Sequence, residues 1–218
     1  MILQKKAAKK EDQKMKALYL CVAAVAVIVV VLGLVLNRDK APEDGAVLAA
    51  DPIGTYYATV EIADYGTIEL ELYGDVAPVS VANFVALAQS GYYDGLTFHR
   101  IIKGFMMQGG DIDGDGYPND DVETIVGEFS ANGYTNNIPH ERGVISMARS
   151  NAPDSASTQF FICHEDAPHL DGQYAAFGKV ISGMEVVDAV CEAAQPLDNN
   201  GTIAPEDQPV MTSVTIHQ

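Results

Sequence analysis

Apolar and polar residues alternate with a period of two over residues 57–62 (YATVEI), and more regularly over 67–72 (TIELEL). A strand that is buried on one face shows this alternation. Tyr65 and Gly66 lie between the two stretches, and this pair is typical of a tight turn. The pattern therefore predicts a β-hairpin at the start of an ordered domain.

Two helices are predicted in the same region. The first begins at Pro78 and runs up to Gly91, and the second covers about 184–193, directly after Gly183. From residue 96 onward the chain otherwise consists of short apolar stretches separated by Gly, Pro, Asn and Asp, and the last of them is 210–217. Many strands and only two helices favour an all-β sheet closed on itself, with helices at its openings.

A longer apolar segment precedes this domain. Residues 17–36 (ALYLCVAAVAVIVVVLGLVL) contain no charge, and as a helix they would span roughly 30 Å, the thickness of the hydrocarbon core of a bilayer. Residues 1–16 hold six lysines and two acidic residues. Because lysines are retained on the cytoplasmic side, the pattern predicts a single-pass anchor with its N-terminus in the cytoplasm.

Three other interpretations of this segment are less consistent with the sequence. A cleaved signal peptide has a shorter apolar run and a small-residue cleavage site, whereas 37–40 (NRDK) follow here. A lipoprotein cysteine would follow its apolar run, whereas Cys21 precedes most of it. A buried core helix does not need a lysine-rich flank. A membrane anchor remains the prediction.

The chain is thus expected to have four parts: a basic cytoplasmic tail (1–16), the anchor (17–36), a flexible linker rich in Pro, Gly and Ala (37–54) and a folded domain (55–218). Of the formal charge of −17, residues 1–36 contribute +4, so the remainder carries −21. A domain this acidic would repel nucleic acid and anionic lipid surfaces.

The three cysteines do not form a disulfide framework. Cys21 lies in the predicted anchor, Cys163 in a predicted buried strand and Cys191 near the end of the second helix. We therefore expect buried thiols.

The strongest chemical signal lies in residues 98–110 (FHRIIKGFMMQGG). Arg100 has a permanent charge and five hydrogen-bond donors. Phe105 and Met106 are side chains suited to receive an apolar ring. Three further motifs follow along the chain: 157–163 (STQFFIC), 170–172 (LDG) and 177–180 (FGKV).

In order and spacing these motifs resemble the cyclophilins, the peptidyl-prolyl cis-trans isomerases, from about residue 56 to residue 216. The resemblance implies a closed eight-stranded antiparallel barrel capped by two helices. It also implies an enzyme that accelerates rotation about X-Pro bonds without a cofactor. The barrier to that rotation is about 18–20 kcal/mol, because the amide loses its resonance when it twists.

The resemblance assigns roles to particular residues. Arg100 would donate to the prolyl nitrogen, which becomes a true acceptor only in the twisted amide, and Gln108 would bind the substrate backbone and steady the arginine. Arg149 stands where the best-known members have Asn, and Tyr174 stands where many members have His. His169 stands at the position of the family's pocket tryptophan, which puts high-affinity cyclosporin binding in doubt. The substrate-binding residues implied by the resemblance are Phe105, Met106, Ala148, Arg149, Gln159, Phe161, His169, Leu170 and Tyr174.

A competing motif starts at Asp111, where 111–116 (DIDGDG) has the acidic residues and glycine of a calcium loop. Position 12 would be Val122 rather than glutamate, so calcium is not expected. The histidines do not fall at the spacings of zinc ligands. His99 precedes Arg100 on a predicted strand, and we expect a hydrogen-bonded core histidine there.

The sequence thus predicts a membrane-tethered isomerase whose domain lies outside the cytoplasm and acts on X-Pro bonds of unfolded or exported proteins. Residues 151–156 (NAPDSA) resemble the prokaryotic form of this loop in the cyclophilins, so a bacterial setting is expected. One alternative is a non-catalytic module that only binds proline-containing segments, as a chaperone or scaffold. Retention of Arg100 and Gln108 favours the enzyme. A calcium-dependent adhesion domain is a second alternative.

Overall fold

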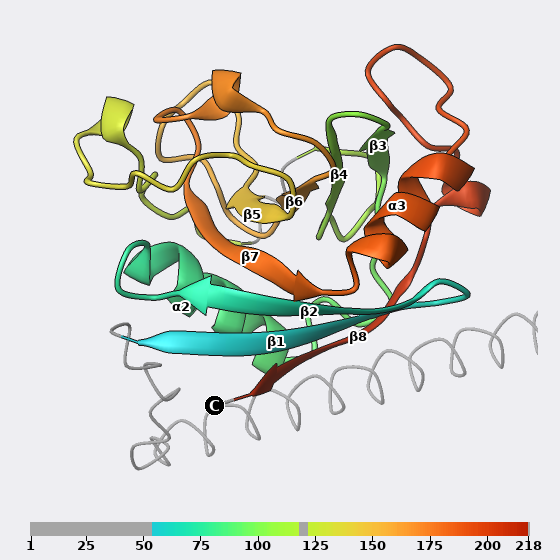
Figure 1. Ribbon diagram of the computed structural model, residues 1–218, viewed down its shortest axis with the longest axis horizontal. Coiled ribbons are helices and arrows are strands. Elements are labelled where there is room, and N and C mark those ends of the chain that lie inside the picture. Colours follow the sequence, from blue (N-terminus) through green and yellow to red (C-terminus); the bar gives the residue numbers. More distant parts are fainter. Residues whose placement is uncertain (1–53, 118–121, 218) are drawn as a thin grey trace, which may run out of the picture. The chain divides into compact units, whose positions relative to one another are not determined.

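The structure is a computed structural model that describes residues 54–117 and 122–217 (Figure 1). The predicted cytoplasmic tail, the membrane anchor and nearly all of the linker lie outside these ranges, as does Cys21. Within the described ranges no helix is both long and apolar enough to cross a membrane.

Eight antiparallel strands form one sheet in the described part of the chain, in the order β3-β4-β6-β5-β7-β2-β1-β8. Two α-helices, α2 (Pro78–Gln89) and α3 (Met184–Ala193), and three short 3-10 helices, η1 (Ser130–Asn132), η2 (Pro168–Leu170) and η3 (Pro205–Asp207), accompany it. The strands are β1 (Thr55–Ile62), β2 (Gly66–Tyr73), β3 (Arg100–Ile102), β4 (Met106–Gly109), β5 (Val144–Met147), β6 (Phe160–Cys163), β7 (Ala176–Ser182) and β8 (Met211–His217).

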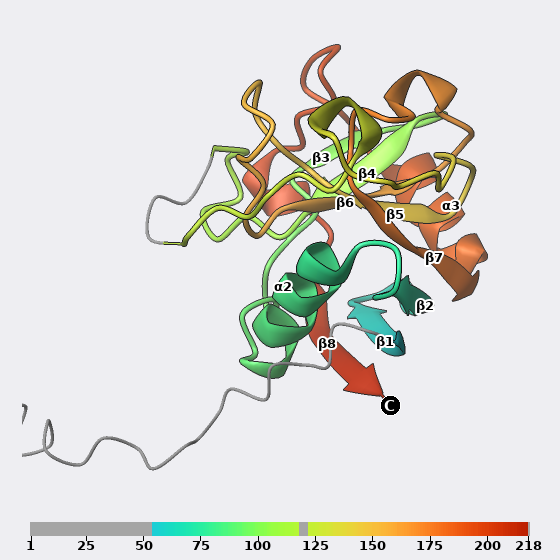
Figure 2. The ribbon, with the colours of Figure 1, turned by 90° about the vertical axis from the view of Figure 1, so that its left-hand side faces the viewer.

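The sheet is a curled half-barrel, with α2 near one end and α3 near the other (Figures 1 and 2). The prediction of a closed barrel was therefore wrong in one respect, because the edge strands β3 and β8 do not pair directly. The segment before β3 is joined to the start of β8 by an isolated antiparallel bridge between Thr97 and Val210. Its hydrogen bonds run from Phe98 N–H to the Pro209 carbonyl (2.9 Å), from Met211 N–H to the Leu96 carbonyl (2.8 Å) and from Gly95 N–H to the Met211 carbonyl (2.8 Å). Pro209 has no N–H to donate and β3 has only three residues, so the pairing at this edge is short.

The predicted hairpin and both helices are present. β1 and β2 pair along their whole length, from Thr55 opposite Tyr73 to Ile62 opposite Gly66. Helix α3 has the predicted bounds, and α2 stops at Gln89, two residues before Gly91. Gly91 has a φ of +74°, which ends the helix.

The N-terminus of α2 is capped from a distant loop. The buried carboxylate of Glu128 accepts hydrogen bonds from Val79 N–H (3.0 Å), Ser80 N–H (2.7 Å) and the Ser80 hydroxyl (2.7 Å). A carboxylate at this position accepts hydrogen bonds from N–H groups that have no partner within the helix. Its negative charge also interacts favourably with the positive end of the helix dipole. The contact joins segments almost fifty residues apart and fixes the helix to the loop that leads to η1.

The two faces of the sheet pack into two separate apolar clusters. Side chains such as Ile101, Met107 and Phe160 belong to the main core inside the curl. Residues one position away in sequence, among them Met106 and Phe161, belong to a second apolar cluster on the opposite face, together with Val144, Cys163, Ala167, Leu170 and Ala176. Because successive side chains on a strand point to opposite faces, the sheet supports a core on one side and a separate apolar surface on the other.

The two described cysteines are buried free thiols, as predicted. Burial raises the pKa of Cys163, in β6, and of Cys191, in α3, to about 12 in both cases. Neither thiol is therefore ionised near neutral pH.

His99 is buried as predicted, with 4% of its surface exposed. The expectation that it is hydrogen-bonded is not met, because neither ring nitrogen has a partner among the described residues. Burial lowers the pKa of His99, partly opposed by the nearby charges of Asp111 and Asp115, so the ring is neutral at pH 7.

Gly178 is a point where the curl leaves no room for a side chain. It lies opposite Leu72 on β2 and Ile145 on β5, and a Cβ atom there would meet the Glu71 carbonyl oxygen and approach Leu72 Cδ2 to 3.0 Å. We expect Gly178→Ala to lower the free energy of unfolding by about 2 kcal/mol, because the β2 backbone must move. Denaturant unfolding measures this change.

The control is Ser182→Ala, on the exposed end of the same strand, which should change stability by less than about 0.5 kcal/mol. Equal stability of Gly178→Ala and the wild type would show that the spacing between β2 and β7 is not limiting.

Candidate active site

A pocket of about 180 Å³ opens on the outer face of the sheet, beside β3, β4 and β6. Nine of the eleven site residues predicted from the sequence line it, and they come from segments between residues 100 and 174. The other two, Gln159 and His169, contact lining residues but do not line the pocket themselves. The lining residues are Arg100, Phe105, Met106, Gln108, Ala148, Arg149, Phe161, Leu170 and Tyr174.

Arg100 is half-buried at the start of β3, and its guanidinium is held in place from two sides. Nε donates to the carbonyl of Asn200 (2.7 Å), and one terminal nitrogen, Nη1, donates to Gln108 Oε1 (3.1 Å) and lies 3.8 Å from Met106 Sδ. Burial lowers the pKa of Arg100, opposed by Tyr174 and Asp198. An arginine nevertheless stays protonated at neutral pH, so the pocket contains a permanent, oriented cation.

A chain of amide hydrogen bonds extends from Arg100. Gln108 Nε2 donates to Gln159 Oε1 (2.9 Å), and Gln159 Nε2 donates to the carbonyl of Tyr117 (3.0 Å). The Gln108 side chain is therefore held through both atoms of its amide, because the oxygen accepts from Arg100 and the nitrogen donates to Gln159. Gln159 lines a second pocket of about 130 Å³ that shares Gln108, Ala148 and Arg149 with the first.

The floor and walls of the first pocket are apolar. Met106, Phe161 and Leu170 are each less than 10% exposed, and all three belong to the second apolar cluster. His169 lies outside the lining, in η2, with its ring 5.3 Å from the ring of Phe105. That His169 contacts substrate stays a prediction, because its ring lies beside a residue that lines the pocket.

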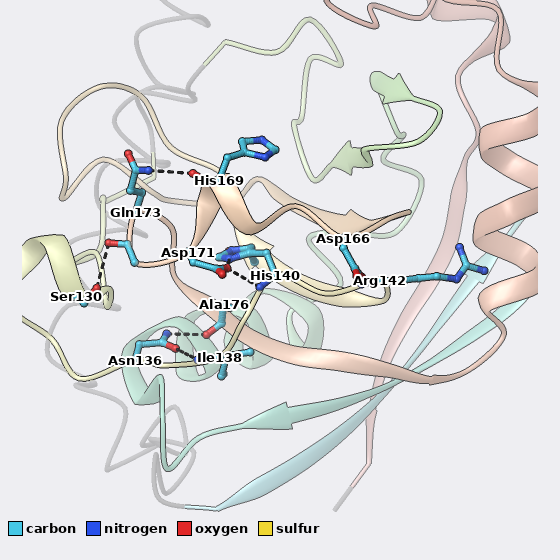
Figure 3. Close-up of polar contacts among 12 residues, drawn as sticks. Ser130, Asn136, Ile138, His140, Arg142, Asp166, His169, Asp171, Gln173 and Ala176 are labelled. Atoms are coloured by element: carbon cyan, nitrogen blue, oxygen red, sulfur yellow. Dashed lines mark hydrogen bonds and ion pairs between the residues drawn. The ribbon is translucent and has the colours of Figure 1, made fainter.

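A buried histidine that the sequence analysis did not assign supports the wall from behind (Figure 3). His140 Nδ1 lies 3.0 Å from Asp171 Oδ1 and Nε2 lies 3.1 Å from the Ser146 hydroxyl. The imidazole is nearly parallel to the ring of Phe161, with 6.1 Å between centres. Burial lowers the pKa of His140, partly opposed by Asp171. A neutral ring therefore donates to Asp171 and accepts from Ser146.

Arg149 lies at the rim, where Phe129 and Tyr174 flank it. Nε and Nη2 donate to the carbonyl of Gln173 (2.9 and 2.8 Å), and Nη1 donates to the carbonyl of Ser150 (2.8 Å). The guanidinium carbon is 5.0 Å from the ring centre of Phe129 and 4.6 Å from that of Tyr174. Phe129 and the carbonyl of Asn200 gave no signal in the sequence, because one comes from a remote loop and the other is a backbone atom.

The acidic turn after β4 uses its carboxylates for local hydrogen bonds. Asp111 Oδ2 accepts from Gly116 N–H (2.6 Å), and Asp115 Oδ1 accepts from Tyr117 N–H (2.9 Å). Among the described residues, no group of three or more His, Cys, Asp or Glu side chains has the geometry of a metal site.

Sequence comparisons agree with this geometry. Residues 57–217 match the family model described as cyclophilin type peptidyl-prolyl cis-trans isomerase. Peptidyl-prolyl cis-trans isomerase B of Bacillus subtilis is 48% identical over 124 residues, covering 57% of this chain and 82% of the relative. Peptidyl-prolyl cis-trans isomerase CYP18-1 of Arabidopsis thaliana is 43% identical over 157 residues, covering 70% of this chain and 91% of the relative.

Solved structures agree as well. A crystal structure of a cyclophilin type peptidyl-prolyl cis-trans isomerase from Cryptosporidium parvum superposes with a TM-score of 0.65 at 31% identity, covering 76% of this chain and 99% of the other. The same protein solved in the presence of the dipeptide Ala-Pro gives a TM-score of 0.64 at 31% identity, with 74% and 99% coverage. With the family model matching most of its length, this chain belongs to the cyclophilin family and is a peptidyl-prolyl cis-trans isomerase.

Proposed function

We propose that Arg100 carries the catalysis by donating a hydrogen bond to the prolyl nitrogen of the substrate while the X-Pro amide is twisted. Reducing the exchange time from tens of seconds to milliseconds requires about 5.5 kcal/mol off the barrier. One preorganised donor in a water-excluded site contributes about 2.7–4 kcal/mol, because the planar amide nitrogen cannot accept the bond and the twisted one can.

The observation that carries this proposal is the partial use of the Arg100 donors. Nε and Nη1 are occupied by Asn200 and Gln108, which fix the plane of the guanidinium. Nη2 has no hydrogen-bond partner among the described residues, and no carboxylate of those residues forms an ion pair with Arg100. The group is thus oriented by neutral oxygens and retains donors for a ligand in the pocket.

The apolar pocket would hold the proline ring while the preceding carbonyl swings. A ring of this size fits a pocket of about 180 Å³ bounded by Phe105, Met106 and Phe161. Gln108 and the backbone of Ala148 lie at the same rim, where an extended peptide can bind as an added strand. The Cryptosporidium relative, solved in the presence of Ala-Pro, supports a proline-containing ligand for this chain too.

The alternative raised by the sequence was a non-catalytic module that only binds proline segments. Such a module needs the apolar pocket but gains nothing from a donor aimed at the twisted amide. The fixed position of Arg100 therefore favours the enzyme mechanism, and the two functions differ in what loss of the guanidinium does to rate and to binding.

We further propose that the domain works outside the cytoplasm on unfolded or exported proteins of a bacterium, tethered by residues 17–36. The support is the uncharged twenty-residue run with a lysine-rich flank, and the net charge of −21 beyond it. The form of residues 151–156 and the similarity to the Bacillus enzyme support the bacterial setting.

Replacing Arg100 tests the mechanism. We expect Arg100→Ala to reduce kcat/KM for a short X-Pro peptide at least a hundredfold, because about 2.7–4 kcal/mol of transition-state stabilisation is lost. Arg100→Lys keeps the charge but cannot bond Asn200 and Gln108 in the same plane, so it should also be severely impaired. The measurement is peptide isomerisation by the full chain in detergent, alongside peptide affinity. A wild type that binds the peptide without isomerising it would leave only the binding module.

The pH dependence tests whether a histidine takes part. We expect kcat/KM to change less than about twofold between pH 6 and 8, because arginine does not titrate there. Since the pKa of folded His140 lies below its ordinary value of 6.5, the stability it contributes is complete above that pH and is lost as the pH falls through the folded-state value.

The melting temperature should accordingly fall as the pH drops below 6.5, and less steeply in His140→Asn. A bell-shaped rate profile centred between pH 6 and 8 would assign chemistry to a histidine instead.

Membrane tethering predicts how the chain fractionates in a bacterial cell. The full chain should stay with the membrane after an alkaline carbonate wash, and protease added outside the inner membrane should digest the domain. In the variant Ile28→Lys, Val29→Lys each charge opposes insertion by about 2.5–3.5 kcal/mol, so the protein should be released. Recovery of a shortened wild-type domain in the soluble fraction would instead indicate a cleaved signal peptide.

A further inference from the structure

We propose that Arg149 makes the site select proline segments that carry a carboxylate side chain directly beside the proline. The inference rests on the proposed function, since it concerns the peptide bound in the same pocket. It adds a substrate class, namely acidic X-Pro or Pro-X segments.

The ion pairs of the basic residues give the first support for this proposal. Residues 54–217 contain five Lys and Arg. The three outside the pocket form ion pairs with carboxylates, Lys103 with Glu192 at 2.7 Å, Arg142 with Asp188 at 2.8 Å and Lys179 with Glu141 at 3.7 Å. By contrast, no carboxylate among the described residues forms an ion pair with either arginine that lines the pocket.

The position of Arg149 is the second line of support. It lines both the proline-sized pocket and the adjoining pocket of about 130 Å³, as do Gln108 and Ala148. A peptide with its proline in the first pocket and its neighbouring residue in the second must therefore pass along Arg149. The side chain next to the proline comes into reach of the guanidinium on this path.

The guanidinium of Arg149 is preorganised for this contact. Its three bonds to the carbonyls of Gln173 and Ser150, and its place between Phe129 and Tyr174, hold the group in one orientation. Three of its five N–H groups are used in this way, which leaves two for a ligand. Because the side chain is already ordered, binding a carboxylate costs little further conformational entropy.

The acidic surface around the pocket makes the pocket's preference for a carboxylate unusual within this domain. Residues 54–217 contain 24 Asp and Glu, so most of the surface repels an anionic segment. At the pocket, however, a flanking carboxylate meets two cations that lack a carboxylate partner within the described residues, whereas a flanking lysine meets their repulsion. The attraction of a carboxylate to the two arginines thus acts against the repulsion from the acidic surface. Added salt weakens both interactions.

The experiment measures isomerisation of tetrapeptides that differ only at one residue flanking the proline: Glu, Ala or Lys before it, and the same three after it. We expect the wild type to process Glu peptides with a kcat/KM about fivefold above that of Lys peptides in one of the two series, at low ionic strength. The ratio should shrink in 0.5 M salt. The neutral Ala peptide reports the isomerase activity itself.

Three variants assign the effect. Arg149→Gln should lower the Glu-to-Lys ratio at least threefold, whatever it does to the rate with Ala. Arg149→Lys should keep most of the ratio, because the charge remains even though the planar bonds to Gln173 are lost. Lys179→Gln removes the same charge on β7, outside the pocket, and should leave the ratio unchanged.

Some outcomes would overturn the inference without affecting the proposed function. Equal rates for Glu and Lys peptides in both series, with normal activity on the Ala peptide, would show that Arg149 does not select charge. A ratio that persists in Arg149→Gln, or falls equally in Lys179→Gln, would show that selection comes from elsewhere. Loss of the ratio in Arg149→Lys would assign it to loop geometry rather than to charge.

Discussion

The register across four neighbouring strands is the constraint on which the site depends. Arg100 lies opposite Gln108, Gln108 opposite Phe161, and Phe161 opposite Ser146, so one lateral row crosses β3, β4, β6 and β5. Cross-strand partners point to the same face, and therefore the cation, the amide, the aromatic wall and the hydroxyl that bonds His140 all emerge together. A shift of one residue in any of these strands would turn its member of the row into the core.

Polar groups behind the pocket keep this row in place. His140 spans from Asp171 to Ser146 directly behind Phe161, and Glu128 ties α2 to the loop that leads toward the pocket rim. Buried polar groups are stable only when they are hydrogen-bonded, so each of these contacts fixes a loop that the strand ladder does not reach. Burial also lowers the pKa of His140, so this side chain is neutral at pH 7. Arg100 and Arg149 are thus the permanent charges of the pocket, in a domain that is otherwise strongly acidic.

The sequence alone predicted the β1–β2 hairpin, both helices and nine of the residues that line the pocket. The hairpin and helices follow from local periodicity, and the lining residues follow from motifs whose order resembles a known family. The predicted tail, anchor and linker depend only on composition and charge along the chain, and they stay predictions because they lie outside the described residues. Buried thiols were also correctly predicted, since apolar context along the chain is enough to indicate them.

Tertiary structure alone decided the contacts between segments that are distant in sequence. The edge strands β3 and β8 do not pair directly, and the ring of His169 lies 5.3 Å from that of Phe105 without lining the pocket. The Asn200 carbonyl that holds Arg100 has no side-chain signature. Sequence patterns report periodicity and residue type, which act over a few residues. The direction of a side chain and the partner of a backbone carbonyl are set only when the chain folds back on itself.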